Sequence, residues 1–211
     1  MTGSKPGTGA TASRPLGLFG GRFDPVHRAH IAIAQAVANE LNLDEVRWII
    51  TGSPVHKPAV APAHHRLHMV ELALHELGDT RMAIDAREIS AANEGKNNYS
   101  ADTIASIQIE FPERKIIWIL GEDQLEHFQT WSRWSWIIKR VTLAVCGRPN
   151  SDSQAISRVL RDLGADIRWI ALSPDKVSST LIRNQIRSGI SDTDLLPSSV
   201  YNYISENKLY K

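Results

Sequence analysis

Two glycines, an Asp-Pro pair and two histidines lie together near the N-terminus, in residues 20–30 (GGRFDPVHRAH). Gly20 and Gly21 let the backbone approach a ligand closely. His27 and His30 stand three residues apart at the predicted start of a helix, so both lie on one helical face. A helix N-terminus offers N–H donors and the positive end of the helix dipole. The cluster predicts a phosphate-binding turn, although two surface histidines after a glycine turn would explain either histidine alone.

A second group of polar residues lies near the C-terminus, in residues 177–183 (VSSTLIR). Ser178 or Ser179 suits the N-cap of a helix, and Thr180 adds a third hydroxyl. Arg183 follows within one helical turn, and its guanidinium fork matches a phosphate group. Plain capping beside a surface arginine explains this segment equally well by itself. Paired with the histidine turn, it favours a clamp for a triphosphate.

Other chemistry finds less support. Gly-x-Gly-x-x-Gly is absent, and so is the Gly-x-x-x-x-Gly-Lys-Ser/Thr phosphate loop, which argues against hydride transfer and P-loop hydrolysis. The 24 Lys and Arg residues against 23 Asp and Glu give a net charge of +1, which disfavours binding to a long nucleic acid. No apolar run is long enough to span a membrane. We expect no protein-bound metal, because His64, His65 and His68 lack a placed carboxylate partner.

Strands and helices alternate along the chain and must position these clusters. Apolar runs predict strands at 16–19, 46–50, 82–84, 116–120, 141–145 and 167–171. Helical spacing predicts helices at 31–41, 64–77, 101–110, 153–163, 180–187 and 198–207, whereas 90–99 (SAANEGKNNY) is typical of a loop. We therefore predict an α/β fold: one domain, residues 16–211, with a doubly wound parallel sheet and a small C-terminal helical portion. Residues 1–15 are expected to form a flexible tail. Ligands should bind in the loops after the strands ending near residues 19, 50, 120 and 171.

Both clusters, in this order, resemble those of the nucleotidyltransferase superfamily. Within it the chain is similar to the bacterial nicotinate mononucleotide adenylyltransferases, from about Leu16 to Tyr210. Further matching segments are 52–57 (GSPVHK), 65–67 (HRL), 98–103 (NYSADT), 121–123 (GED), 130–131 (TW), 196–197 (LP) and 207–210 (NKLY). The chain departs from the family pattern in having Arg22 where a small hydroxyl residue is usual, Ala29 for glycine and Ser100 for threonine.

The resemblance implies a Rossmann-like nucleotidyltransferase fold and a role for each matching residue. The ATP-side turn would be shaped by Gly20, Gly21 and Phe23. The phosphates would contact His27, His30, Ser178, Ser179, Thr180 and Arg183, with His27, His30 and Arg183 as the catalytic group. Lys57 would reach toward the phosphates or the incoming mononucleotide. The nucleotide ribose would lie at Gly121 and Asp123, and the pyridine substrate at Trp131 and Ser100. For three of these the plainer alternatives stay open: a solvated Lys57, a helix-capping Asp123, and a Trp131 that only packs with Trp134 and Trp136.

The implied reaction transfers AMP from ATP to nicotinate mononucleotide, a step of NAD biosynthesis, with Mg²⁺ bound through the ATP phosphates. The attacking phosphate is already an anion, so the reaction needs no general base. The single cysteine, Cys146, is expected in the core and agrees with a reducing cytoplasm. Phosphopantetheine adenylyl transfer, cytidylyl transfer and a non-catalytic nucleotide sensor are the alternatives. The sequence leaves open the oligomeric state, a homo-oligomer included, and the choice between the acid and amide mononucleotide.

Overall fold

The computed structural model describes residues 13–53, 59–172, 177–190 and 193–211. Its sheet has six parallel strands in the order β3-β2-β1-β4-β5-β6. The strands are β1 (Leu16–Gly21), β2 (Glu45–Ile50), β3 (Met82–Asp85), β4 (Ile116–Gly121), β5 (Val141–Cys146) and β6 (Asp166–Ile170). The winding direction reverses between the neighbouring strands β1 and β4, where such sheets bind their ligands. The predicted doubly wound parallel sheet is confirmed.

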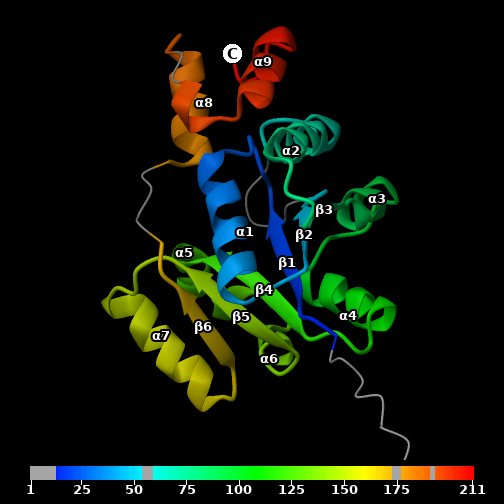
Figure 1. Ribbon diagram of the computed structural model, residues 1–211, viewed down its shortest axis with the longest axis vertical. Helices are drawn as coiled ribbons and strands as arrows, with labels where there is room; N and C mark the ends of the chain where they lie inside the picture. Colours follow the sequence, from blue (N-terminus) through cyan, green and yellow to red (C-terminus); the bar gives the residue numbers. More distant parts are fainter. Residues whose placement is uncertain (1–12, 54–58, 173–176, 191–192) are drawn as a thin grey trace, which may run out of the picture.

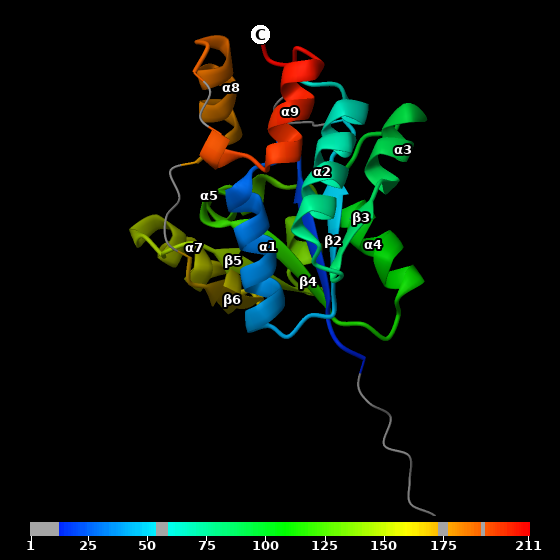
Figure 2. The same ribbon diagram turned by 45° about the horizontal axis from the view of Figure 1, so that its top comes forward.

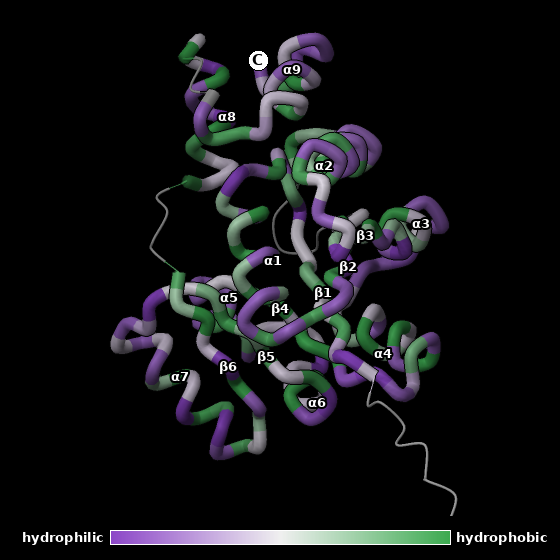
Figure 3. Tube along the Cα trace, viewed as in Figure 1, coloured by the Kyte–Doolittle hydropathy of each residue, from purple (hydrophilic) through white to green (hydrophobic). Residues whose placement is uncertain are grey.

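Helices cover both faces of this sheet (Figures 1 and 2). The longer ones are α1 (Arg28–Glu40), α2 (Ala63–Leu77), α4 (Ser100–Glu110), α7 (Ser151–Asp162), α8 (Ser179–Arg187) and α9 (Ser198–Glu206). Successive strand side chains point to opposite faces, so Phe19 packs in the cluster containing Val37 of α1, whereas Leu18 packs in the one containing Ile104 of α4. Apolar residues recur among polar ones along α7, as a helix with one buried side requires (Figure 3). No helix in the described ranges could cross a membrane.

Short helices were not predicted in two places. Helix α3 (Arg87–Asn93) occupies part of the segment expected as a loop, and α5 (Glu122–Glu126), η1 (Phe128–Thr130) and α6 (Trp134–Ile137) connect β4 to β5. Helix α3 buries the side chain of Ile89. A single large apolar residue cannot produce the helical periodicity by which a helix is recognised in a sequence. It begins where the Asp85 carboxylate accepts hydrogen bonds from the backbone and side chain of Arg87. The burial of Ile89 and the Asp85–Arg87 hydrogen bonds therefore stabilise a helix that the apolar pattern does not predict.

The C-terminal helical portion consists of α8, η2 (Thr193–Leu195) and α9 at one end of the molecule, with α9 beside α2 (Figures 1 and 2). Glu76 of α2 accepts hydrogen bonds from the backbone N–H groups of Ser198 and Ser199, at 3.1 and 2.8 Å. His65 bonds the Tyr203 hydroxyl at 2.8 Å, so this histidine packs one helix on another.

Cys146 ends β5 and is 6% exposed, which confirms its predicted place in the core. Burial raises the pKa of its thiol to about 12, so the thiol stays protonated and unreactive at neutral pH.

Candidate active site

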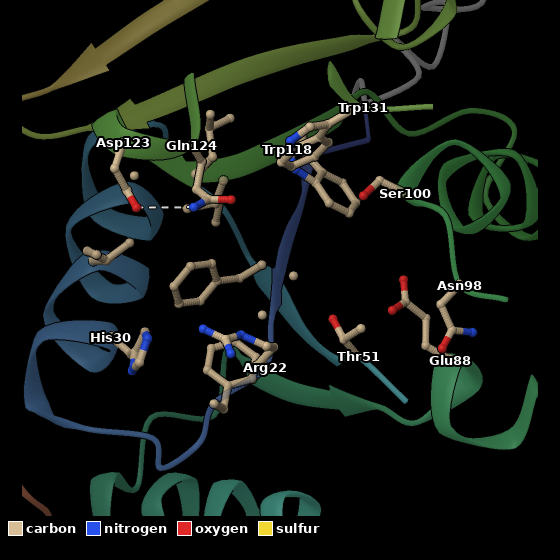
Figure 4. A pocket seen from close by; sticks show the side chains of 18 of the residues that line it. Arg22, His30, Thr51, Glu88, Asn98, Ser100, Trp118, Asp123, Gln124 and Trp131 are labelled. Atoms are coloured by element: carbon tan, nitrogen blue, oxygen red, sulfur yellow. Dashed lines mark hydrogen bonds between the residues drawn. The ribbon is translucent and has the colours of Figure 1, made fainter. Parts of the chain in front are cut away.

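A pocket of about 500 Å³ lies at the carboxyl ends of β1, β2 and β4, where the strand order predicts a ligand site (Figure 4). The predicted site residues that line it come from five separate segments of the chain. They are Gly20, Gly21, Phe23, His30, Ser100, Gly121, Asp123, Trp131 and Ser179. Folding thus brings most of the N-terminal cluster, and Ser179 of the C-terminal cluster, to one cavity.

Packing between Gly21, Phe23 and His30 fixes the turn after β1, which lines the pocket. Phe23 has a φ of 48°, which is unusual for a bulky residue, and its ring folds back under the chain. A Cβ on Gly21 would lie 2.8 Å from that ring, so only glycine fits there. The Phe23 ring then packs edge-on against His30, at 5.1 Å between centroids.

The buried Asp24 carboxylate joins this turn to two distant segments. It accepts hydrogen bonds from the backbone N–H groups of Val60 and Ala61, at 2.7 and 3.1 Å, and from the Tyr210 hydroxyl at 2.8 Å. Burial and the Asp24 charge raise the pKa of Tyr210, so its hydroxyl stays protonated and donates. The Tyr210–Asp24 hydrogen bond therefore joins the C-terminal segment to the turn that carries the histidines.

Arg66 of α2 is 1% exposed and ties together the loops below the pocket. Its guanidinium donates to the carbonyl oxygens of Ala61, Arg22 and Gly52, at 3.1, 2.8 and 3.3 Å. The backbone of the turn that carries Arg22 is thereby fixed relative to the loop that follows β2.

The two histidines play different structural parts. His27 is the N-cap residue of α1 and is only 5% exposed, whereas His30 lines the pocket and stacks on His27 with ring centroids 3.6 Å apart. The backbone N–H of His27 donates to Nδ1 of His30 at 3.2 Å. Burial, and then repulsion from His27, lower the pKa of His30 well below its ordinary value. His30 is therefore neutral at pH 7, and with Nδ1 accepting, its proton sits on Nε2 as a donor.

The lowered pKa of His30 predicts a pH-dependent stability. Between its folded and unfolded pKa values the unfolded chain binds more protons, so the unfolding free energy falls as pH drops below about 6.5. Urea unfolding should show the wild type losing stability relative to His30→Gln between about pH 7 and about pH 5. A difference that stays constant over this range would contradict the burial of a neutral imidazole.

The C-terminal cluster meets the histidine turn. Ser178 is the N-cap of α8, and its hydroxyl accepts from the N–H of Leu181 at 3.1 Å, which confirms one of the two predicted caps. Ser179 lines the pocket and donates to the Pro25 carbonyl at 3.0 Å. The N-terminus of α8 is thus positioned close to the start of α1.

Arg183 is 5% exposed and its guanidinium bonds within the protein. It donates to the Asp24 carbonyl at 2.6 Å and to the Thr180 hydroxyl at 3.2 Å. It lies outside the residues that line the pocket, as do His27, Ser178 and Thr180. In this arrangement Arg183 anchors α8 to the turn after β1.

The end of β4 contributes Gly121 and Asp123. A Cβ on Gly121 would lie 2.7 Å from an Asp123 carboxylate oxygen, so glycine leaves room for that side chain. Gln124 donates to Asp123 at 3.1 Å (Figure 4). Asp123 is in the first turn of α5, and Gly121 is the N-cap residue of that helix. The predicted ribose-side residues therefore line the pocket together.

Trp131 and Ser100 line the pocket on the side of α4 (Figure 4). The Trp131 ring lies edge-on to Trp118, with centroids 6.2 Å apart, and is tilted against Phe128 at 5.1 Å. Trp131 thus packs with the core and also faces the cavity. Packing of Trp131 against other aromatic residues is therefore compatible with its stacking on the pyridine ring of a substrate.

Sequence reasoning missed several lining residues, chiefly Thr51, Glu88, Trp118 and Gln124. Burial raises the pKa of Glu88, which accepts from the Thr103 hydroxyl at 2.7 Å. The rule that ligands bind at strand ends could have found Thr51 after β2. Glu88 offered no signal, because its short helix was not predicted. Lys57 lies outside the described residues.

Comparisons with known proteins show the family of the chain. The cytidylyltransferase-like family matches residues 18–185 of the chain. A Bordetella petrii relative named "Probable nicotinate-nucleotide adenylyltransferase" is 38% identical over 200 residues, covering 93% of this chain and 98% of the relative. A relative of the same name from Neisseria meningitidis serogroup A is 37% identical over 205 residues, covering 94% and 99%. The chain belongs to the nicotinate-nucleotide adenylyltransferase family.

Solved structures show that the fold of this adenylyltransferase family member recurs in distant proteins. The Plasmodium falciparum nicotinic acid mononucleotide adenylyltransferase complexed with NaAD aligns with a TM-score of 0.79 at 16% identity, covering 94% of this chain and 98% of that one. The same Plasmodium falciparum enzyme complexed with APC gives a TM-score of 0.77 at 15% identity. At these identities the likeness concerns the fold alone.

Proposed function

We propose that this protein transfers the adenylyl group of ATP to nicotinate mononucleotide, releasing pyrophosphate and forming nicotinate adenine dinucleotide. The observation that carries the proposal is that segments from both ends of the chain meet at the pocket at the switch point. Asp24 accepts from Tyr210 and, through its backbone carbonyl, from Arg183, so the histidine turn and α8 are held as one unit. A phosphate-to-phosphate reaction needs such preorganised donors, because both reactants are anions.

In the proposed reaction an oxygen of the mononucleotide phosphate attacks the α-phosphorus of ATP. The bond from that phosphorus to the bridging oxygen breaks, and pyrophosphate leaves with the electron pair. His30 donates from Nε2 to phosphate oxygens, while His27 fixes its tautomer through a backbone N–H. Bound through the ATP phosphates as part of the co-substrate, Mg²⁺ would supply neutralisation of the charge on the leaving group.

The remaining roles are assigned by position. Ser179 and the N-terminal amides of α8 bind the outer phosphates, with Ser178 and Thr180 at the same helix end. Arg183 positions that helix against the turn after β1. Gly121 and Asp123 face the ATP ribose, and Lys57 keeps the role that the resemblance implies, toward the phosphates or the incoming mononucleotide.

Trp131 and Ser100 bind the pyridine end of the mononucleotide in this scheme. Trp131→Ala should weaken mononucleotide binding by about 1–3 kcal/mol, the usual contribution of an aromatic ring stacked on a base. Isothermal titration would measure the affinities for mononucleotide and for ATP separately. Trp136→Ala is the matched control, because Trp136 belongs to the same tryptophan group but lies under the Arg140 guanidinium, at 4.1 Å. Equal losses in the two variants would reject the stacking role.

One assay tests the function itself. The purified protein is incubated with ATP, Mg²⁺ and one acceptor: nicotinate mononucleotide, its amide, or phosphopantetheine. Pyrophosphate release with nicotinate mononucleotide, and a weaker rate with the other two, is the expected result. Pyrophosphate release with phosphopantetheine but not with either mononucleotide would show that phosphopantetheine is the acceptor. ATP binding without pyrophosphate release from any acceptor would indicate a nucleotide sensor.

A further inference from the structure

We infer that Arg22 binds the phosphate group of the acceptor mononucleotide and is a specificity-determining residue of this site. The inference rests on the proposed function and concerns a residue to which the family resemblance gives no role. Arg22 follows Gly20 and Gly21, the last two residues of β1, and lines the pocket (Figure 4).

The charge of the pocket singles out Arg22. Among the described residues that line the cavity, it is the only lysine or arginine, and the carboxyl groups there are those of Asp24, Glu88 and Asp123. His30 contributes no charge at neutral pH, because burial lowers its pKa. A guanidinium stays protonated at all physiological pH values. Arg22 is therefore the fixed positive charge that the described wall offers to two phosphorylated substrates.

The position of Arg22 points to the acceptor. The residue directly follows Gly21, whose carbonyl accepts from the N–H of Thr51 at 3.0 Å, so the turn is joined to the end of β2. Thr51, Glu88 and Asn98 lie on that side of the pocket, whereas His30 and Asp123 lie on the other (Figure 4). A mononucleotide with its pyridine near Trp131 and Ser100 must place its phosphate between these two sides, where Arg22 lies.

The backbone of Arg22 is held rigidly enough for such a contact. Its carbonyl oxygen accepts from Arg66 at 2.8 Å, and the following residue, Phe23, is fixed by its packing under Gly21. The planar guanidinium fork loses less freedom per hydrogen bond than a lysine ammonium does, and it can form two parallel hydrogen bonds to a phosphate. Lysine at this position would keep the charge but lose the fork.

The test compares ligands with and without the phosphate. Equilibrium binding of nicotinate mononucleotide and of nicotinate riboside is followed by quenching of tryptophan fluorescence, since Trp118 and Trp131 line the pocket. Arg22→Ser should weaken mononucleotide binding by about 10- to 100-fold and leave riboside binding unchanged. Arg22→Lys should recover part of the loss.

Arg28→Ser provides a matched control. Arg28 is exposed at the start of α1 and lines a separate groove with Glu76, so the same charge is removed away from the pocket. This variant should bind the mononucleotide as the wild type does. The inference is wrong if Arg22→Ser lowers the affinities for mononucleotide and riboside equally, or if it binds the mononucleotide more tightly than the wild type. It is also wrong if Arg22→Ser and Arg28→Ser bind the mononucleotide with the same affinity.

Turnover separates this inference from the proposed function. If the wild type releases no pyrophosphate with nicotinate mononucleotide, the proposed function fails whatever the variants do. If the wild type is active and Arg22→Ser raises only the KM for ATP, the function stands and the acceptor role of Arg22 is overturned. A raised KM for the mononucleotide, with KM for ATP unchanged, supports the inference.

Discussion

Replacing His30 with alanine should lower kcat for adenylyl transfer by about 10²–10³, the usual effect of removing one preorganised donor from a charged transition state. His30 lines the pocket as a neutral imidazole whose Nδ1 accepts from the backbone of His27, so its Nε2 proton is aimed as a donor. Alanine removes that donor and the stack on His27. Steady-state rates of pyrophosphate release under saturating ATP and mononucleotide measure the change.

Two variants separate donation from packing. His30→Gln retains an amide N–H in a side chain of comparable reach and should keep more activity than His30→Ala. His75→Ala is the control, since His75 lies in the last turn of α2, outside the pocket-lining set. A fall of less than about 5-fold in His30→Ala would show that the imidazole contributes little to the reaction.

Replacing Asp24 with alanine should lower the free energy of unfolding by about 3–5 kcal/mol, as expected when one member of a buried charged network is removed. Asp24 is 1% exposed and accepts from Val60, Ala61 and Tyr210. Alanine leaves those three donors without their acceptor inside the protein, and each unsatisfied donor is destabilising. Chemical denaturation in urea measures the effect.

The Asp24 network can be dissected by smaller changes. Tyr210→Phe removes a single donor together with its hydrogen bond and should cost about 1 kcal/mol. Asp162→Ala is the control, because that aspartate is exposed at the end of α7 and should change stability by less than about 0.5 kcal/mol. If Asp24→Ala were no more destabilising than Asp162→Ala, the network would not hold the turn.

The position of the site followed from local patterns. The uninterrupted apolar run that became β4 identified a central parallel strand, since both of its faces are buried. Glycines at the end of β1 with histidines a few residues later, and hydroxyls after β6, then indicated the edge of the sheet where strands end. Each of these signals lies within a short stretch of sequence, so they can be recognised without a three-dimensional structure.

The sequence by itself therefore determined the sheet, the two clusters and the family resemblance. Only the tertiary structure decided that His30 faces the pocket while His27 lies buried beside it, and that Arg183 anchors α8 rather than lining the cavity. Arg183 and Tyr210 reach Asp24 across 159 and 186 residues, and no periodicity encodes a hydrogen bond between such distant side chains. The same holds for Arg22, because its charge is visible in the sequence but only the fold shows that it lines the pocket.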